Sequence, residues 1–430
     1  MIIVDQALKR RQSEGCPIRV GLIGAGYMGR GIALQILTAI PGMTLVAVYN
    51  RHIPDALRAY QNAGVNDVRV VETAAQLSVA IRAGHCAVTE NAMAICEAEG
   101  VDAIIEVTGT IEFGAQVVLA AAHAGKQIIL MNAELDATLG PILKVYAERV
   151  GVALSTADGD QPGVIMNLIR HVRSIGFKPV LAGNMKGLHD PYRTPETQKE
   201  FAARNKQKPA MVTSFADGTK ISMEMAVVAN ATGFRVGRRG MYGPRCNHVR
   251  KAAELFNEEQ MLQGGLVDYI LGAEPAPGVF VIGYNDNPLQ QQYMQYYKMG
   301  DGPFYVFYAP YHLCHLEAPL TVARVVLFGD TAATPQGAPV CEVIAIAKRD
   351  LKAGEIIDGL GGFCCYGVLE NTDVRKAENL LPQGLAEGCR LKRRILKDQA
   401  LSYADIDIPT GRLCDRLWGE QNSLGGGIVA

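Results

Sequence analysis

The chain has 430 residues, which is longer than one hydrophobic core usually supports, so two or three domains are expected. Lysine plus arginine (42) and aspartate plus glutamate (43) almost cancel, so no overall field attracts nucleic acid or an anionic membrane. Local groups must therefore bind any anionic ligand, which favours a small-molecule substrate over a polymer.

The cysteines and the apolar runs of the chain bear on its location. The ten cysteines contain no CxxC pair, so neither a zinc site nor a disulfide framework is expected. The apolar run 2–4 is too short for a signal peptide, and no segment reaches the ~20 apolar residues of a membrane helix. We expect a cytoplasmic protein with free thiols and no metal, and a homo-oligomer (dimer or tetramer).

The first third of the chain alternates short apolar runs with amphipathic stretches. A leading helix is expected over 1–16. Expected strands follow at 18–23, 43–49, 103–107, 127–131 and 152–155, and expected helices at 28–40, 56–63, 113–124 and 139–150. Near-continuous apolar strands that alternate with helices indicate a parallel sheet covered on both faces. We predict an α/β chain in which residues 1–157 form a Rossmann domain with a doubly wound parallel sheet.

The remainder of the chain lacks this regular alternation. The long polar stretch 188–209 and the isolated helices expected at 164–175 and 220–231 indicate an α+β substrate and dimerisation domain over 158–302. Short strands punctuated by glycine and proline indicate a small β-rich domain over 303–430.

A glycine-rich turn follows the first expected strand. It consists of Gly24, Ala25, Gly26, Tyr27, Met28 and Gly29. The first glycine permits a tight turn, the second lets a pyrophosphate approach the backbone, and the third lets the helix pack closely on the strand. Unpaired N–H groups and the partial positive charge of the helix N-terminus then face the phosphates. The turn therefore predicts a bound nicotinamide dinucleotide.

Residues at later strand ends complete the predicted cofactor site. Asn50 stands where an NAD-binding site usually has an acidic residue, and Arg51 can pair with a 2′-phosphate, so NADP (NADPH) is favoured over NAD. The alternative is that Arg51 is a solvated loop residue. Thr108, Gly109 and Asn132 are expected to line the cofactor, because ligands of open α/β sheets lie beyond the carboxyl ends of the strands.

Acidic residues near the end of the first domain are further candidates. Glu134 is expected to reach the substrate, or else to cap the following helix. Asp158 and Asp160, with Gln161, follow the last Rossmann strand. Such carboxylates can orient a hydroxyl, bind a cation or shift each other's pKa, and we place Asp160 and Gln161 in the substrate site. The alternative is a turn that caps the helix from Val164.

Two lysines in sparse, glycine-containing segments are the catalytic candidates. Hydride transfer to a carbonyl leaves negative charge on oxygen, which the ammonium of Lys186 or Lys220 can stabilise and protonate. Asp217 joins them as a catalytic candidate and Asn184 as a substrate-binding one. The alternative for both lysines is an ordinary surface position. A cluster of four arginines is expected to hold a substrate phosphate or carboxylate, or else to be a solvated or subunit-facing patch: Arg235, Arg238, Arg239 and Arg245.

At these segments the chain resembles a known family. The Rossmann half resembles homoserine dehydrogenase. Five segments are similar to a homoserine-dehydrogenase-like family that ends in an SAF domain: 159–163, 183–191, 214–220, 347–355 and 381–388. The family includes a 1-deoxy-D-xylulose 5-phosphate reductoisomerase-like enzyme. The resemblance implies that NADPH reduces a rearranged, phosphorylated ketose to 2-C-methylerythritol 4-phosphate, with Lys186 and Lys220 polarising the carbonyl and the arginines, Arg238 among them, holding the phosphate.

Two other functions remain as alternatives. True homoserine dehydrogenases carry a catalytic lysine in the loop after the fifth strand, where this chain has Asn132, Ala133 and Glu134. That departure weighs against plain homoserine oxidation. A non-catalytic dinucleotide sensor, whose SAF-like module binds a partner, is the other alternative. The lysines of the central region weigh against it, because a sensor needs no proton donor.

Overall fold

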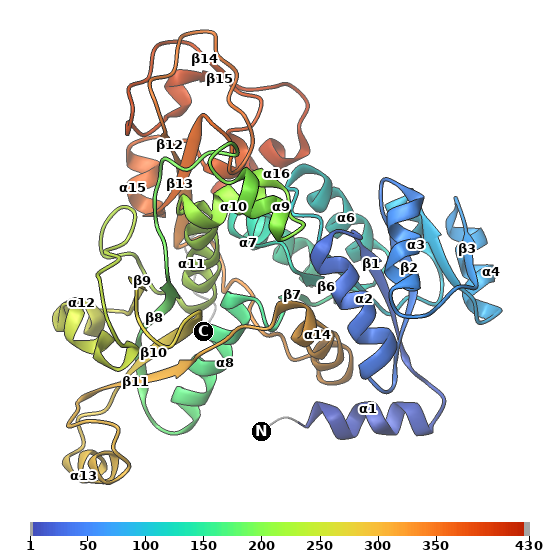
Figure 1. Cartoon of the computed structure of the whole chain (residues 1–430), viewed down its shortest axis with the longest axis horizontal. Coiled ribbons are helices and arrows are strands. Elements are labelled where there is room, and N and C mark those ends of the chain that lie inside the picture. The colour runs from blue at the N-terminus through green and yellow to red at the C-terminus, as the bar shows by residue number, and fades with distance from the viewer. Residues whose placement is uncertain (1–2, 425–430) are drawn as a thin grey trace. The chain divides into compact units, whose positions relative to one another are not determined.

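The computed structural model describes residues 3–424, which form two compact units (Figure 1). The first unit contains Met1–Asp160 and Leu313–Thr334, and the second contains Gln161–His312 and Pro335–Ala430. The chain therefore passes from one unit to the other three times. These bounds differ from the three consecutive segments expected from the sequence. The difference arises from the packing of two helices, residues 314–328 and 219–232.

The first unit is built on a seven-stranded parallel sheet in the order β3-β4-β2-β1-β5-β6-β7. Its strands are β1 (Ile18–Ile23), β2 (Met43–Tyr49), β3 (Val68–Val70), β4 (Cys86–Thr89), β5 (Ala103–Glu106), β6 (Gln127–Leu130) and β7 (Leu154–Thr156). The chain winds outward from β1 in both directions, so the strand order reverses between β1 and β5, where such sheets bind ligands. The predicted α/β class and doubly wound parallel sheet are confirmed, whereas β3 and β4 were not predicted.

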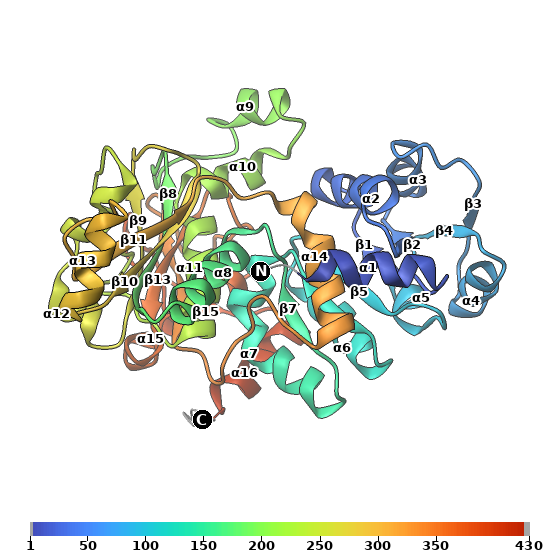
Figure 2. The same ribbon diagram turned by 90° about the horizontal axis from the view of Figure 1, so that it is seen from below.

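Helices cover both faces of this sheet (Figure 2). One layer contains α2 (Tyr27–Ala39), α3 (Ile53–Gln61) and α14 (Cys314–Phe328), and α1 (Val4–Ser13) packs on α14. The other layer contains α4 (Ala74–Arg82), α5 (Ala92–Glu97), α6 (Glu112–His123) and α7 (Ala133–Arg149). Side chains of β1, β2, β5 and α2 form the fully buried core between the layers. The first two residues of the expected leading helix lie outside the described residues.

Helix α14 explains why residues 313–334 belong to the first unit. Right-handed crossovers place α6 and α7 on the same face of β5, β6 and β7, so the opposite face of these strands needs another helix. Helix α14 covers it with Ala318, Val322 and Ala323, which are fully buried. Arg324 of α14 also forms an ion pair with Asp158 at 2.8 Å.

The second unit contains a four-stranded mixed sheet in the order β11-β10-β8-β9. Its strands are β8 (Lys178–Lys186), β9 (Leu266–Leu271), β10 (Gly278–Tyr284) and β11 (Phe304–Ala309). Strands β8 and β9 run parallel, and the other neighbours are antiparallel. One face packs on α8 (Gln161–Ser174) and α11 (Thr219–Thr232), and the other on η1 (Val249–Leu255) and α12 (Glu258–Leu262). Two short helices, α9 (Lys199–Arg204) and α10 (Pro209–Ala216), precede α11.

Helix α11 joins the C-terminal segment to the second unit. It packs on β8 and β9 and also on the antiparallel pair β12 (Cys341–Ala347) and β13 (Cys365–Asn371), as Figure 1 shows. Because both sides are covered, its buried residues surround the helix rather than form one stripe. The C-terminal segment continues with α15 (Thr372–Ala377), η2 (Gln383–Leu385), β14 (Arg390–Leu391), η3 (Tyr403–Asp405), β15 (Ile406–Asp407) and α16 (Leu413–Asn422).

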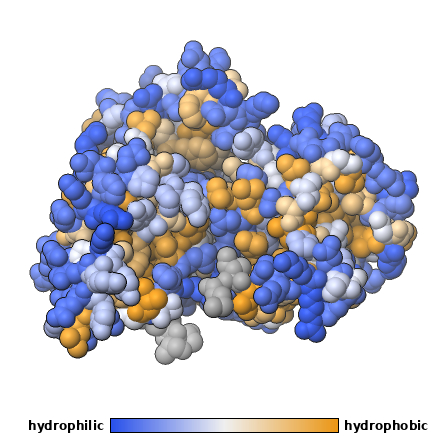
Figure 3. All heavy atoms as spheres, turned by 60° about the horizontal axis from the view of Figure 1, so that its bottom comes forward, coloured by the Kyte–Doolittle hydropathy of each residue, from blue (hydrophilic) through white to orange (hydrophobic). Residues whose placement is uncertain are grey.

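One helix of the second unit has no buried residue. Helix α13 (Pro288–Tyr296) connects β10 to β11 and exposes large side chains, among them Leu289, Tyr293 and Tyr296. Hydrophobic residues are scattered among hydrophilic ones on the face drawn in Figure 3. Among the described residues, no helix is long and apolar enough to cross a membrane.

Candidate functional site

The glycine turn of the first unit has the geometry that a pyrophosphate requires. Gly24 directly follows β1 and has φ +118°, a conformation that strongly favours glycine. A Cβ atom on Gly29 would clash with the carbonyl oxygen of Gly24, so only glycine permits this approach of helix and strand. A Cβ atom on Gly26 would meet no protein atom within 4 Å, so open space lies where the pyrophosphate is expected. The residues present therefore fit a dinucleotide.

The N-terminus of α2 begins at this turn without a capping side chain. Gly26 occupies the N-cap position, and the first turn contains no acidic residue. Ala25 is buried, and Tyr27, which is 51% exposed, is followed by the partly buried Met28. The leading N–H groups and the positive end of the helix dipole thus have no internal carboxylate to neutralise them. This arrangement suits an anionic ligand.

The end of β2 presents Asn50 and Arg51. The Nδ2 group of Asn50 donates to the carbonyl oxygen of His52 at 3.2 Å and lies 3.5 Å from Oδ2 of Asp55. Arg51 is exposed, and its guanidinium forms no ion pair with any residue from 3 to 424. It is thus available to a ligand.

A buried carboxyl group links the ends of β5 and β6. Glu106 is fully buried and accepts hydrogen bonds from the backbone N–H of Thr108 at 2.9 Å, from its hydroxyl, and from Nδ2 of Asn132 at 2.7 Å. Asn132 also donates to the carbonyl oxygen of Thr110 at 2.9 Å. Together with Gly109 (φ +69°), this network fixes the loop after β5. The predicted residues Thr108, Gly109 and Asn132 therefore lie close together at the carboxyl edge of the sheet.

Glu134 lies in the first turn of α7 and is 5% exposed. Asn132, rather than Glu134, caps this helix, because its Oδ1 accepts from the N–H of Leu135 at 3.1 Å. The alternative reading of Glu134 as the cap is therefore wrong. Burial is the main cause that raises the pKa of Glu106 to about 7. The charge of Glu134 also contributes to this rise.

The pKa of Glu106 predicts a pH dependence of stability. Its ordinary value is 4.5 and its folded value about 7, so the folded protein holds a proton that the unfolded chain releases. The stability from this proton is present below pH 4.5 and is lost as pH rises through about 7. We expect Glu106→Gln to lose less stability than the wild-type protein between pH ~5 and ~8, by at most ~3 kcal/mol in the free energy of unfolding. Differential scanning fluorimetry should show this as a smaller fall in Tm over the same pH range.

Two features make that measurement decisive. Asp136, whose pKa burial raises to about 6, acts in the same direction and remains in the variant, so the pH dependence should shrink without vanishing. The exposed Glu99, paired with Arg82 at the surface, provides the control Glu99→Gln, which should keep the wild-type dependence. An unchanged dependence in Glu106→Gln would contradict the prediction.

The two acidic residues after β7 have different contacts. The carboxylate of Asp158 is bound by Arg324 at 2.8 and 3.0 Å, which ties α14 to the loop after β7. Asp160 is 6% exposed, and its charge contributes to raising the pKa of Asp136. Gln161 begins α8, is buried, and lies 3.2 Å (Nε2 to Nε2) from His312. No group of three or more His, Cys, Asp or Glu side chains among residues 3–424 is arranged to hold a metal.

In the second unit, the carboxyl end of β8 carries Asn184 and Lys186. Asn184 is fully buried, and its Nδ2 lies 3.4 Å from Oε2 of Glu224 on α11. Lys186 is partly buried at the last position of the strand. Lys220 lies in the first turn of α11, the helix that carries Glu224. Strand and helix thus place both predicted lysines, with Asn184, on one side of the mixed sheet.

A histidine–tyrosine pair not predicted from the sequence lies beside these lysines. Nδ1 of His189 is 2.9 Å from the hydroxyl of Tyr269 on β9. A Cβ atom on Gly218 would lie 2.5 Å from Nε2 of the same imidazole, so Gly218 allows His189 to reach the N-terminus of α11. Burial lowers the pKa of His189, and the charge of Lys186 lowers it further, whereas Asp217 and Asp190 raise it.

Asp217 is fully buried directly before α11. Its Oδ1 accepts from the N–H of Thr219 at 2.9 Å, and its Oδ2 lies 2.8 Å from Nζ of Lys348. Asp217 therefore lies next to His189 and forms an ion pair with Lys348. Its partner comes from the C-terminal segment, about 130 residues away along the sequence, which explains why the pair was not predicted.

The four arginines do not converge on one site. Arg235 pairs with Asp373 at 2.6 Å, and Arg239 pairs with Glu370 and Glu378, each at 2.7 Å. Arg238 donates to the carbonyl oxygens of Met241 and Tyr242, at 2.9 and 3.4 Å. Acidic side chains and carbonyl groups thus engage three of the guanidinium groups that were expected to hold a phosphate.

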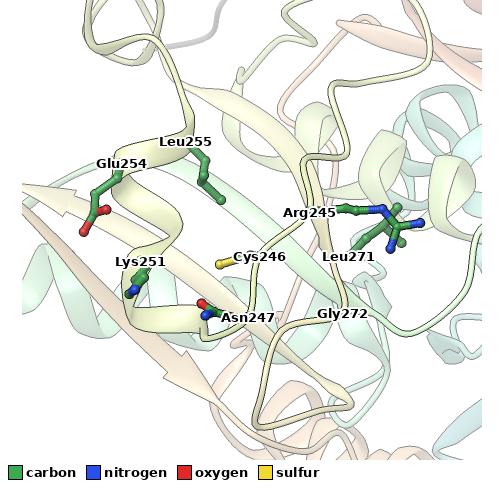
Figure 4. Close-up of a pocket in the computed structure, with 8 residues that line it drawn as sticks. All are labelled: Arg245, Cys246, Asn247, Lys251, Glu254, Leu255, Leu271 and Gly272. Carbon is green, nitrogen blue, oxygen red and sulfur yellow. The ribbon is translucent and has the colours of Figure 1, made fainter.

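The fourth arginine borders a shallow pocket of about 420 Å³ (Figure 4). It is lined by Arg245, Cys246, Asn247, Lys251, Glu254, Leu255, Leu271 and Gly272. The side chain of Arg245 points away from Lys251 and Glu254, so the two cations do not converge on a single ligand. The N–H of Gly272 donates to the carbonyl oxygen of Lys186 at 2.8 Å, so the pocket adjoins the end of β8.

The central segment matches a known catalytic domain. Residues 159–318 match the family described as oxidoreductase DRL, catalytic domain, and this range nearly coincides with the segment Gln161–His312 of the second unit. Homoserine dehydrogenase from Corynebacterium glutamicum is 44% identical over 66 residues, which are 15% of this chain and 15% of that protein. The chain thus spans about 15% of the length of that curated relative.

Solved structures of dehydrogenases are also similar. A probable dehydrogenase from Thermotoga maritima has a TM-score of 0.43 and 14% identity, covering 73% of this chain and 90% of its own. Scyllo-inositol dehydrogenase from Lactobacillus casei, with bound NAD(H) and scyllo-inositol, has a TM-score of 0.37 and 14% identity, covering 62% and 73%. A DOX-P reductoisomerase in complex with magnesium has a TM-score of 0.38 and 16% identity, covering 73% and 70%.

The strand order and the glycine turn are those of a dinucleotide-binding Rossmann unit, and the segment that follows it matches an oxidoreductase catalytic domain. More particularly, residues 159–318 are similar to the DRL oxidoreductase catalytic domain, and a further 66-residue match is to a homoserine dehydrogenase.

Proposed function

We propose that this protein uses NADPH to reduce the carbonyl group of a small polyhydroxylated compound. The observation that supports it most is the group of Lys186, Lys220 and the His189–Tyr269 pair around the N-terminus of α11. These are proton donors and cations within the DRL-type catalytic domain. A dinucleotide sensor has no use for such a group, so a reaction is the better explanation.

The proposed mechanism needs a positive environment for the substrate oxygen. A nicotinamide bound at the glycine turn would supply the hydride. The ammonium groups of Lys186 and Lys220 polarise the carbonyl, stabilise the negative charge that develops on its oxygen and deliver a proton to it. Asn184 and Gln161 offer polar groups for substrate hydroxyls, and the His189–Tyr269 pair can pass a proton from solvent to a lysine.

The preference for NADPH rests on Arg51. Because the guanidinium is exposed and has no acidic partner between residues 3 and 424, we propose that it pairs with the 2′-phosphate, while Asn50 lacks the charge that would repel it. Arg51→Glu should weaken NADPH binding about 10- to 100-fold and change NADH binding little, because a charge-assisted hydrogen bond contributes about 1.5–3 kcal/mol. Isothermal titration calorimetry measures both affinities.

The control for this prediction is Arg58→Glu, which makes the same change of charge at an exposed site on the following helix, α3. It should leave both affinities within about twofold, because its guanidinium already pairs with Asp55 at 3.5 Å. Equal losses of NADPH affinity in the two variants would mean that overall charge, rather than Arg51, determines the preference.

The substrate class can be tested by assaying two compounds side by side. We propose that 1-deoxy-D-xylulose 5-phosphate or a related ketose is turned over with NADPH. Homoserine with NADP or NAD is the second candidate, since a homoserine dehydrogenase is 44% identical over 66 residues. Turnover of the ketose and not of homoserine supports the proposal, and the reverse supports the second candidate. Binding of NADPH without oxidation by any sugar, keto acid or amino alcohol would favour the sensor.

A further inference from the structure

A buried lysine from the C-terminal segment lies under the candidate substrate site. Lys348 follows β12, and its side chain is 2% exposed. Its Nζ donates to the carbonyl oxygen of Arg193 at 2.8 Å and to that of Gly362 at 2.7 Å, and lies 2.8 Å from Oδ2 of Asp217. Two carbonyl groups and the carboxylate of Asp217 thus surround the buried ammonium, which holds these three groups together.

The same contacts join the loop that carries His189 to Asp217 and to the C-terminal segment. The carbonyl of Arg193 belongs to the loop after β8, in which Arg193 also pairs with Asp190 at 3.0 Å. The N–H of Asp190 in turn donates to the carbonyl oxygen of Ala216 at 2.8 Å, just before Asp217. The loop that carries His189 is therefore fixed on one side by backbone contacts and on the other by Lys348.

The charge of the pair matters because Asp217 is fully buried. A buried carboxylate that loses its cation pays a desolvation cost, which it can reduce by moving away from its buried position. The charged groups that act on His189 are Asp217 and Asp190, which favour the imidazolium, and Lys186, which disfavours it. The hydroxyl of Tyr269 holds Nδ1. Among these groups, Asp217 is the carboxylate that Lys348 holds in place.

We propose that Lys348 is a positioning residue: it holds the carboxylate of Asp217 and the loop that carries His189 in place beside the candidate catalytic lysines. The C-terminal segment is on this view part of the substrate site rather than an appendage. The role in turnover rests on the proposed function, whereas the effect on His189 does not.

The direct test is an NMR titration of the histidine side chains in the intact protein labelled with ¹⁵N-histidine. The His189→Gln variant assigns the signal of His189. We expect Lys348→Met and Asp217→Asn each to lower the pKa of His189 by about 0.5–1 unit, because Asp217→Asn removes the negative charge next to the imidazole and Lys348→Met releases that charge from its position. The double variant should show the same shift as either single variant, since both act through one charge.

The double variant also answers the concern that Lys348→Met fails to fold, because it contains no unpaired buried charge. Lys352→Met, an exposed lysine of the same segment, is the control and should leave the His189 titration unchanged. An unchanged or raised His189 pKa in Lys348→Met overturns the proposal. If only the double variant folds, a wild-type His189 pKa in it overturns the proposal in the same way.

Turnover then separates this inference from the proposed function. With an accepted substrate, Lys348→Met should lower kcat about 10- to 100-fold with little change in KM or in NADPH affinity, because small displacements of catalytic groups are costly. If the wild-type protein turns over no substrate, the proposed function fails while the His189 titration still tests the link to Lys348. An unchanged kcat together with a shifted His189 pKa would overturn the positioning role.

Discussion

Gly26→Val should abolish dinucleotide binding and leave the protein folded. Gly26 has an ordinary φ of −68°, so a side chain is compatible with the backbone there. No protein atom lies within 4 Å of the position that a Cβ would occupy, so valine fills only the space in which the pyrophosphate is expected. We expect at least ~100-fold weaker NADPH binding, since the phosphates lose contact with the N–H groups of α2.

The comparison that makes this result specific is Gly29→Val. Its Cβ would clash with the carbonyl oxygen of Gly24, so this variant should lose thermal stability as well as binding. Calorimetric titration with NADPH and Tm from scanning fluorimetry measure the two effects separately. If Gly26→Val bound NADPH as tightly as the wild-type protein, the turn would not be the pyrophosphate site, and the proposed function would fail with it.

Lys186→Met and Lys220→Met should each lower kcat about 100- to 10,000-fold, the range expected when a group that stabilises charge and transfers a proton is removed. Methionine preserves most of the length and the apolar stem of each side chain, so packing changes little. Both lysines lie in the catalytic domain, outside the Rossmann unit, so NADPH affinity should stay within about twofold. Steady-state kinetics with the accepted substrate measures kcat.

The matched control is Lys178→Met, at the first position of the same strand that ends in Lys186. Lys178 is exposed and its ammonium contacts the carbonyl oxygen of Leu262 at 3.3 Å, far along the strand from the candidate site. It should keep wild-type turnover. A lysine whose replacement leaves kcat unchanged has no catalytic role, and the other lysine would then carry the proton transfer alone.

The sequence predicted the first unit well where strands are long and continuously apolar. Strands β1 and β2 were placed with their observed bounds, because four or more consecutive buried positions leave little ambiguity. Strand β3 has three residues and none is buried, so it lacks the hydrophobic signal on which such predictions rest. The place of α14 was not predictable, because a helix of this length can cover any open sheet face within reach.

The candidate site was predictable only where its residues lie close together in the sequence at a characteristic spacing. The glycine turn combines its functions within six residues, and its geometry agrees with what the spacing indicates. The His189–Tyr269 and Asp217–Lys348 pairs join residues 80 and 131 positions apart, so no pattern along the chain brings them together. The arginine cluster shows the opposite failure: its members are close in sequence, yet separate acidic partners on β13 and α15 take up two of them.

Helix α14 has a consequence for the order in which the protein is made. Strands β5, β6 and β7 are complete once residue 156 has been synthesised, but the helix that covers their second face ends at residue 328. During synthesis, one apolar face of the sheet therefore stays exposed until more than 150 further residues have left the ribosome. A fragment that stops after the seventh strand would retain that exposed face permanently and should aggregate.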